Sequence, residues 1–181
     1  KFYEIFLFFF QSLYRSSRLK KTCHYIAFSV YSHKKWKGGF FTMEIEGYAF
    51  PDDLYYHKEH FWARVEGNIV VMGANDFAQK LAGQIVYVEM PSVGKEVEQG
   101  KPCGSMESGK WVGRIYAPVS GKVESVNQDI EENPELINES PYEKGWICKI
   151  SSSNLQEELK NLLKGESLID FIKSEIVRVK K

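Results

Sequence analysis

Residues 104–121 read Gly-Ser-Met-Glu-Ser-Gly-Lys-Trp-Val-Gly-Arg-Ile-Tyr-Ala-Pro-Val-Ser-Gly, two strand-like pieces joined at Gly109 and Lys110. A glycine at such a junction permits a tight hairpin turn. A side chain at a hairpin tip is exposed, while the flanking strands hold the backbone that carries it. The segment therefore predicts a β-hairpin with the amine of Lys110 held out at its tip. Taken alone, however, a lysine in a turn is most often only a solvated charge.

Outward from this hairpin, residues 48–150 consist of short apolar pieces separated by turn residues. Residues 61–65 and 69–72 are two such pieces, and Gly67 between them suits a second tight hairpin. Residues 85–89 form another piece, which ends before a proline. Many short strands with closely spaced turns predict a mainly β sandwich or barrel.

Helical periodicity occurs in two places. Residues 76–82 predict one short internal helix, with Asn75 or Asp76 available as its N-cap. The C-terminal segment 154–181 predicts one or two helices broken near Gly165, because leucine and isoleucine recur there at three- and four-residue intervals. An apolar stripe of this kind is usually part of the hydrophobic core, so we expect this segment to pack on the β domain. The alternative is an amphipathic helix that binds a partner protein.

Residues 1–43 differ in composition from the rest. They hold eight Lys or Arg and a single acid, Glu4, together with several serines. We interpret them as an organelle-targeting or poorly defined extension in front of a β domain at 44–153, with the mitochondrion as destination and the plastid as alternative. The apolar run 2–10 is shorter than the roughly 20 residues that span a bilayer, so no membrane association is expected.

The body of the protein is acidic. Residues 44–181 hold sixteen Lys or Arg against twenty-three Asp or Glu. Because nucleic acids attract basic surfaces, this charge disfavours nucleic-acid binding. The three cysteines are Cys23, Cys103 and Cys148, and they are too widely spaced for a zinc or dithiol motif. Any reactive dithiol must then come from a prosthetic group, and we expect a monomer without a metal site.

Several motifs together resemble a known family. The Glu107-Ser108-x-Lys110 core, followed by residues 117–123, resembles the lipoyl-attachment region of glycine cleavage H proteins. Further matches lie at residues 60–62, 83–91 and 133–146, so that the resemblance extends over about 48–165. The Glu-Ser-x-Lys core is shared with the lipoyl domains of 2-oxoacid dehydrogenases, whereas the run at 133–146 is specific to H proteins.

The resemblance implies a fold and a function. The fold would be a lipoyl/biotinyl-type β-sandwich, also called a barrel-sandwich hybrid. Lipoate would be attached to Lys110, and the neighbouring Glu107, Ser108, Gly109 and Trp111 would form the attachment site. The protein would be a carrier, not an enzyme, that takes an aminomethyl group from glycine decarboxylase to the aminomethyltransferase. Dihydrolipoamide dehydrogenase would reoxidise the arm, and a lipoate ligase or lipoyltransferase would attach it.

The chain departs from the family where the loaded arm should be held. The expected cleft positions correspond to Glu59, His60, Lys80 and Arg114, where the family usually has a glutamate after the histidine, a histidine in the short helix and an aspartate after the lysine. Lipoylation is still expected, because the lysine core is intact. An altered cleft leaves two functions open: the glycine-cleavage shuttle, or an H-like relay that passes lipoate to other lipoyl domains.

Three other classes of protein compete with this interpretation. A biotin carrier would have Met on both sides of the lysine, whereas Gly109 and Trp111 flank it here. An enzyme could use His57 and His60 with nearby acids, but no nucleophile or metal ligand accompanies them. A pure interaction module would leave Lys110 unmodified. Trp111 itself is predicted to be partly exposed and to contact the lipoyl arm or a modifying enzyme.

Overall fold

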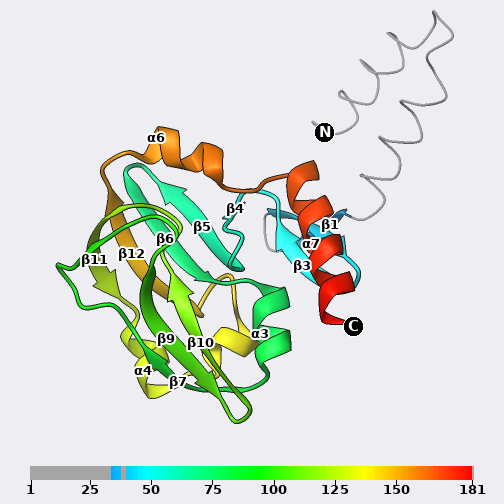
Figure 1. The fold of residues 1–181 in the computed structure, drawn as a ribbon, viewed down its shortest axis with the longest axis horizontal. Helices are drawn as coiled ribbons and strands as arrows, with labels where there is room; N and C mark the ends of the chain where they lie inside the picture. Colours follow the sequence, from blue (N-terminus) through cyan, green and yellow to red (C-terminus); the bar gives the residue numbers. More distant parts are fainter. Residues whose placement is uncertain (1–33, 38–39, 181) are drawn as a thin grey trace, which may run out of the picture. The chain divides into compact units, whose positions relative to one another are not determined.

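The structure is a computed structural model that describes residues 34–37 and 40–180, with side chains described from residue 41 (Figure 1). Contacts divide the chain into two units, Lys1–Lys34 and Lys35–Lys181, and the description below concerns the second. Most of the predicted extension at 1–43 therefore lies outside the described residues. Residues 40–43 form the first part of a strand in which Met43 is buried and pairs with Phe50.

Three sheets make up the described part of the chain. The largest has six strands in the order β4-β5-β6-β12-β11-β8, which are Tyr55–Tyr56, Phe61–Glu66, Ile69–Ala74, Trp146–Ser152, Gly121–Val126 and Glu96–Val97. The second has the order β10-β9-β7, which are Trp111–Tyr116, Pro102–Ser108 and Ile85–Glu89. The third has the order β1-β2-β3, which are Lys34–Lys37, Phe40–Ile45 and Tyr48–Pro51.

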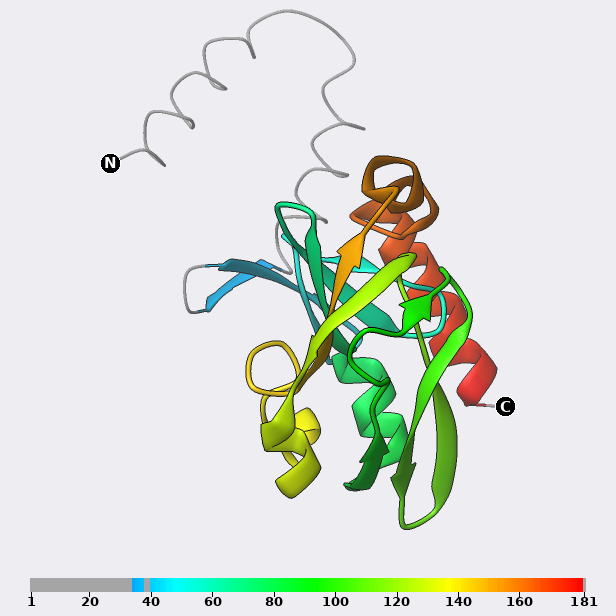
Figure 2. The ribbon, with the colours of Figure 1, turned by 90° about the vertical axis from the view of Figure 1, so that its left-hand side faces the viewer.

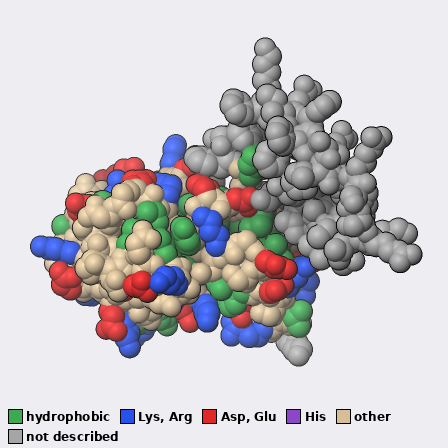
Figure 3. All heavy atoms as spheres, turned by 90° about the horizontal axis from the view of Figure 1, so that it is seen from above, with side chains coloured by type: hydrophobic (Ala, Val, Ile, Leu, Met, Phe, Trp, Pro, Cys, Tyr) green, Lys and Arg blue, Asp and Glu red, His purple; other side chains and the backbone are tan. Residues whose placement is uncertain are grey.

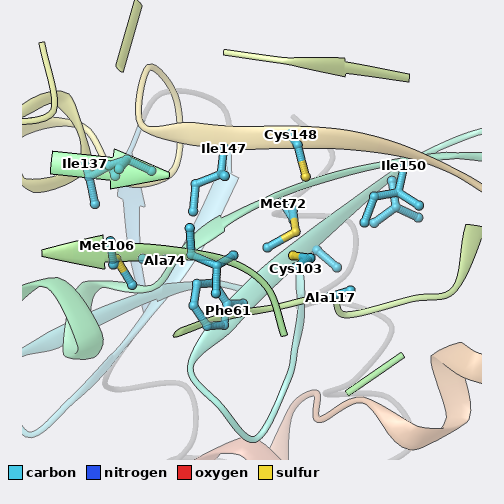
Figure 4. Packing of buried hydrophobic residues seen from close by; sticks show 14 of the residues in the cluster. Phe61, Met72, Ala74, Cys103, Met106, Ala117, Ile137, Ile147, Cys148 and Ile150 are labelled. Atoms are coloured by element: carbon cyan, nitrogen blue, oxygen red, sulfur yellow. The ribbon is translucent and has the colours of Figure 1, made fainter. Parts of the chain in front are cut away.

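The first two sheets enclose the main core. Their alternating apolar side chains are buried together, as expected for two facing sheets that exclude water. Figure 4 shows Phe61, Met72 and Ile147 of the large sheet and Met106 of the second sheet directed into this interior. The predicted β-sandwich is thus confirmed.

The described residues also form five α-helices and one 3-10 turn. They are α3 (Asp76–Ala82), α4 (Gln128–Glu132), α5 (Leu136–Glu139), α6 (Leu155–Glu158), the 3-10 turn η1 (Leu159–Asn161) and α7 (Glu166–Val179). Asn75 caps α3 by accepting a hydrogen bond from the backbone N–H of Ala78 at 2.9 Å. The predicted internal helix and one of its two predicted caps are therefore confirmed.

The C-terminal helix α7 closes a second, smaller core. Its residues Leu168, Ile172 and Ile176 are buried with Phe50 of β3 and Trp62 of β5. The helical stripe is therefore packing surface, as predicted. Gly165, with φ +61°, separates α7 from the preceding turn, which explains the predicted break. None of the helices among the described residues is long and apolar enough to cross a bilayer.

Candidate functional site

Lys110 lies at the tip of the β9–β10 hairpin. The two strands are antiparallel, and Ser108 pairs with Trp111, so that only Gly109 and Lys110 form the turn. Both turn residues are exposed. In Figures 1 and 2 this hairpin extends past the neighbouring strands at the lower edge of the sandwich. The predicted position of the amine, at a tip between two strands, is confirmed.

Ser108 ties this tip to the end of helix α3. Its buried hydroxyl donates a hydrogen bond of 2.7 Å to the backbone carbonyl of Ala82 and accepts one of 3.4 Å from the backbone N–H of Lys110. A buried hydroxyl that both donates and accepts stabilises one turn geometry over others. The serine of the Glu-Ser-x-Lys core is thus a structural clamp on the lysine backbone.

An open groove of about 410 Å³ lies beside Lys110. It is lined by the loop after α3, by Val86 and by the hairpin turn; the residues are Ala82, Gly83, Gln84, Val86, Ser108, Gly109 and Lys110. The Lys110 side chain passes over Gly83, because a Cβ atom added to Gly83 would lie 3.2 Å from Lys110 Cε. Gly83 also has φ +82°, a backbone conformation that favours glycine.

Glu107 and Trp111 have different positions around the tip. Glu107 is half-buried and pairs with Tyr87 on one side and Val112 on the other, both of them exposed. The indole of Trp111 lies along its own strand over Gly113, where an added Cβ would fall within 2 Å of the ring. Trp111 is 41% exposed, which agrees with the predicted partial exposure. An apolar rim therefore borders the lysine.

His60 lies against the C-terminal helix and does not line the groove. Its ring contacts the rings of Phe77 and Phe171, with centroids 4.9 and 5.4 Å away, and its Nε2 is 3.3 Å from Glu175 Oε2 of α7. Burial lowers the pKa of the imidazole below its ordinary value, against the opposing effect of Glu175. The backbone of His60 has φ +66°, a conformation that most side chains disfavour.

Lys80 joins helix α3 to the β2–β3 hairpin. Its Nζ is 2.8 Å from Asp76 Oδ2 and 5.3 Å from the centroid of the Tyr48 ring. The Asp76 carboxylate also accepts hydrogen bonds from the backbone N–H of Ala49 and the side chain of Gln79. Lys80 is therefore one member of a hydrogen-bonded network that fixes the orientation of α3.

The other two predicted cleft residues are also outside the groove lining. Glu59 is exposed near the start of β5. Arg114 is exposed on β10, opposite Ser105, and three residues along the strand place it about 10 Å from Trp111, where the strand begins. None of the four cleft positions expected from the sequence lines the groove beside Lys110: other side chains hold His60 and Lys80, and Glu59 and Arg114 are exposed.

The sequence analysis did not identify two residues of the site, Gly83 and Asn138, as functional positions. Gly83 could have been recognised as the glycine that directly follows a capped helix, a position that often requires a positive φ. The second is Asn138, whose side chain accepts a hydrogen bond from the backbone N–H of Ile85 and donates one to the backbone carbonyl of Gly83. No local sequence pattern indicates that contact, because its partners are more than fifty positions away.

The cysteines of the described part offer no reactive thiol. Cys103 and Cys148 are both buried and free. Burial raises the pKa of the Cys103 thiol to about 11 and raises that of Cys148 as well. Within residues 34–37 and 40–180, no group of three His, Cys, Asp or Glu side chains is arranged to hold a metal ion. The chemistry of the tip accordingly depends on the exposed amine.

Comparison with known proteins agrees with this geometry. The family described as glycine cleavage H-protein matches residues 54–175. The probable glycine cleavage system H protein of Pyrococcus abyssi is 49% identical over 133 residues, 73% of this chain and 98% of that protein. The glycine cleavage system H protein of Anoxybacillus flavithermus is 48% identical over 124 residues, 68% of this chain and 97% of that protein.

A solved structure shows the same fold. The crystal structure of a glycine cleavage system H protein from Mycobacterium marinum superposes with a TM-score of 0.55 and 32% sequence identity, covering 57% of this chain and 87% of that chain. The sequence similarity extends over two thirds of the chain and over nearly the whole length of the curated relatives. The chain therefore belongs to the glycine cleavage H-protein family.

Proposed function

We propose that lipoate is attached through an amide bond to Nζ of Lys110, and that the chain carries it as the H protein of a glycine cleavage system. Family membership makes the chain a carrier protein and not a catalyst. The observation that supports the attachment site is the amine at a two-residue turn, clamped by Ser108 and extended past the sandwich.

The residues around Lys110 fit such a group. Among the described residues Lys110 forms no ion pair, so its amine is available to an incoming carboxyl group. The adjoining groove has no charged side chain in its lining other than that lysine, and Val86 and Ala82 contribute apolar surface. An acyl chain could lie there without burying an unpaired charge.

The chain's own contribution to transfer is presentation. When bound, lipoate would supply a disulfide that accepts the aminomethyl group. Ser108 holds the turn that orients Lys110, and the strands on both sides keep that turn clear of the sandwich. Rigid support of a long arm restricts where its base can be and leaves its end free to reach several active sites.

The proposed partners follow from this role. They are glycine decarboxylase, the aminomethyltransferase, dihydrolipoamide dehydrogenase, and the lipoate ligase or lipoyltransferase that attaches the arm. The exposed side chains of Tyr87, Trp111 and Val112 beside Lys110 supply apolar contact surface for such partners. Figure 3 shows the face that lies uppermost in Figure 1, away from this tip, where acidic and basic side chains are interspersed with apolar ones. Delivery to a mitochondrion, or alternatively a plastid, stays a prediction.

The attachment site can be tested by intact mass. The full chain, incubated with lipoate, ATP and a lipoate ligase, should gain one lipoyl mass on the peptide that contains Lys110. Lys110→Arg should abolish the gain. Lys122→Arg is the matched control, because Lys122 is also exposed and also follows a glycine but lies within strand β11, and it should leave modification complete. An unmodified wild-type chain would contradict the proposal.

The shuttle role is tested by a second step. The lipoylated chain, mixed with glycine and glycine decarboxylase, should gain the aminomethyl mass on the same peptide. A lipoylated chain that accepts no aminomethyl group would contradict the shuttle and agree with the relay function instead. Transfer of lipoate to a separate lipoyl domain would then be the measurement to make.

A further inference from the structure

We propose that Asn138 is a positioning residue for the modification of Lys110: its side-chain amide fixes the loop at residues 83–85, over which the lysine lies. The inference rests on the proposed attachment of lipoate to Lys110. It assigns a role in that reaction to a residue on helix α5, which contributes nothing to the hairpin itself.

Asn138 forms hydrogen bonds with the backbone of the two residues on either side of Gln84. Asn138 Oδ1 accepts a hydrogen bond from the backbone N–H of Ile85 at 2.9 Å, and Nδ2 donates one to the backbone carbonyl of Gly83 at 3.0 Å. Nδ2 also donates to Oε1 of Gln79 at 3.0 Å. A longer contact of 3.4 Å joins Nδ2 to the backbone carbonyl of Gln79. A primary amide has both an acceptor and two donors, so asparagine can serve the Ile85 N–H and these oxygens, whereas aspartate would satisfy only the Ile85 N–H.

The side chain of Lys110 lies over the same loop. Gly83 faces Lys110 Cε, and the carbonyl of Ala82, next to it, accepts the hydrogen bond from Ser108. The loop is thus held from the hairpin by Ser108 and from helix α5 by Asn138. Glu135, which directly precedes helix α5, also contacts the loop: its Oε1 accepts a hydrogen bond of 2.7 Å from Nε2 of Gln84.

Loss of the Asn138 hydrogen bonds would displace the hairpin turn that contains Lys110, in addition to destabilising the fold. Ile85 is fully buried, so its backbone N–H would lose its partner in a place that water does not reach, and the loop would have to shift to satisfy it. The carbonyl of Ala82 would shift with the loop, and Ser108 would then hold the lysine backbone in a different position. Enzymes lose up to about a hundredfold in rate when a reacting group is misplaced by about 1 Å.

Asn127 provides a matched control. It is buried, whereas Asn138 is half-buried, and its side chain makes three hydrogen bonds to the backbone: it donates to the carbonyls of Lys144 and Trp146 and accepts from the N–H of Asp129. None of these partners belongs to the loop at residues 83–85. Removal of either amide should destabilise the fold, but only removal of Asn138 should alter the lysine.

The experiment measures kcat/KM for lipoylation of the full chain by a lipoate ligase, at a temperature at which circular dichroism shows every variant folded. Asn138→Leu, which keeps the volume and loses the hydrogen bonds, should lower kcat/KM about tenfold to a hundredfold. Asn138→Asp keeps the acceptor for Ile85 and should fall between Asn138→Leu and wild type. Asn127→Leu should remain within about twofold of wild type.

A second measurement covers the case in which Asn138→Leu does not fold. In ¹⁵N spectra of the milder Asn138→Asp variant, the backbone amide signals of Ser108 and Lys110 should shift, and in Asn127→Asp they should not. Wild-type rates for the Asn138 variants, equal losses at Asn138 and Asn127, or unshifted hairpin signals would each overturn the inference while leaving the attachment site intact. A wild-type chain that gains no lipoate would overturn the proposed function, and the inference with it.

Discussion

Two regions of this protein contain the residues that the family resemblance assigned to one site. The tip is the β9–β10 turn with Lys110 and the loop at residues 83–85. The flank is the packing contact of α3 with β2–β3 and α7, where Lys80 and His60 lie. At the tip the lysine amine has no ionic partner among the described residues, whereas on the flank Lys80 and His60 face Asp76 and Glu175. A basic side chain is available for chemistry only where packing leaves it unpaired.

The largest effect expected from this comparison separates two glycines. Gly83→Ala should cost about 1 kcal/mol or more in stability, because φ is +82°, and should lower the lipoylation rate about tenfold, because the new Cβ meets Lys110 Cε. Gly165→Ala, on the flank, has φ +61° and no atom within 4 Å, so it should cost a similar stability without any change in rate. Urea unfolding and intact-mass kinetics measure the two quantities. Equal rates in both variants would show that the loop does not position the lysine.

The change in folding stability with pH should depend on the histidine of the flank, His60, and not on residues of the tip. Burial lowers the pKa of His60 in the folded chain, so the unfolded chain binds a proton there more readily. The stability that depends on neutral His60 is complete above its ordinary pKa of about 6.5 and is lost as the pH falls below that value. His57 has a lowered pKa for the same reason and should add to the fall.

His60→Asn isolates the contribution of His60, because asparagine tolerates the left-handed backbone at this position. Denaturant unfolding between about pH 7.5 and 5.5 should show a shallower loss of stability in the variant, by at most about 1.4 kcal/mol per pH unit. The extent of lipoylation at neutral pH should not change. Identical pH profiles for variant and wild type would place His60 outside the acid-sensitive part of the fold.

The smallest expected effect concerns the apolar rim of the tip. Trp111→Ala removes a 41% exposed indole and should slow lipoylation by about threefold, with a change in stability of about 0.5 kcal/mol or less. Val177→Ala is the control, since Val177 is also an exposed apolar side chain, at 58%, but lies on α7 and not at the tip. Single-turnover rates of the two variants decide the matter. If Trp111→Ala and wild type react equally fast, the indole contacts neither arm nor ligase.

Local patterns were sufficient for most of the fold. Alternation and a turn glycine predicted the β5–β6 hairpin, in which Gly67 indeed has φ +70°. A capping asparagine predicted the start of α3. These predictions succeeded because hydrogen bonds within a turn or a helix end connect residues only a few positions apart.

The cleft around the arm could not be predicted in the same way. The resemblance assigned Glu59, His60, Lys80 and Arg114 to one cleft, but only packing determines which face of an element each side chain takes. His60 pairs with Glu175, 115 positions later, and the insertion of α7 against the sandwich creates that contact. Such pairs exist only in the folded chain.

By itself the sequence determined the family, the hairpin and the lysine at its tip, because a short motif and the alternation around it contain that information locally. Only the tertiary structure decided that Lys80 and His60 are engaged on the flank and that Asn138 holds the loop under Lys110. The physical reason is that a polar side chain finds its partners across the fold, and burial makes those partners obligatory once water is excluded.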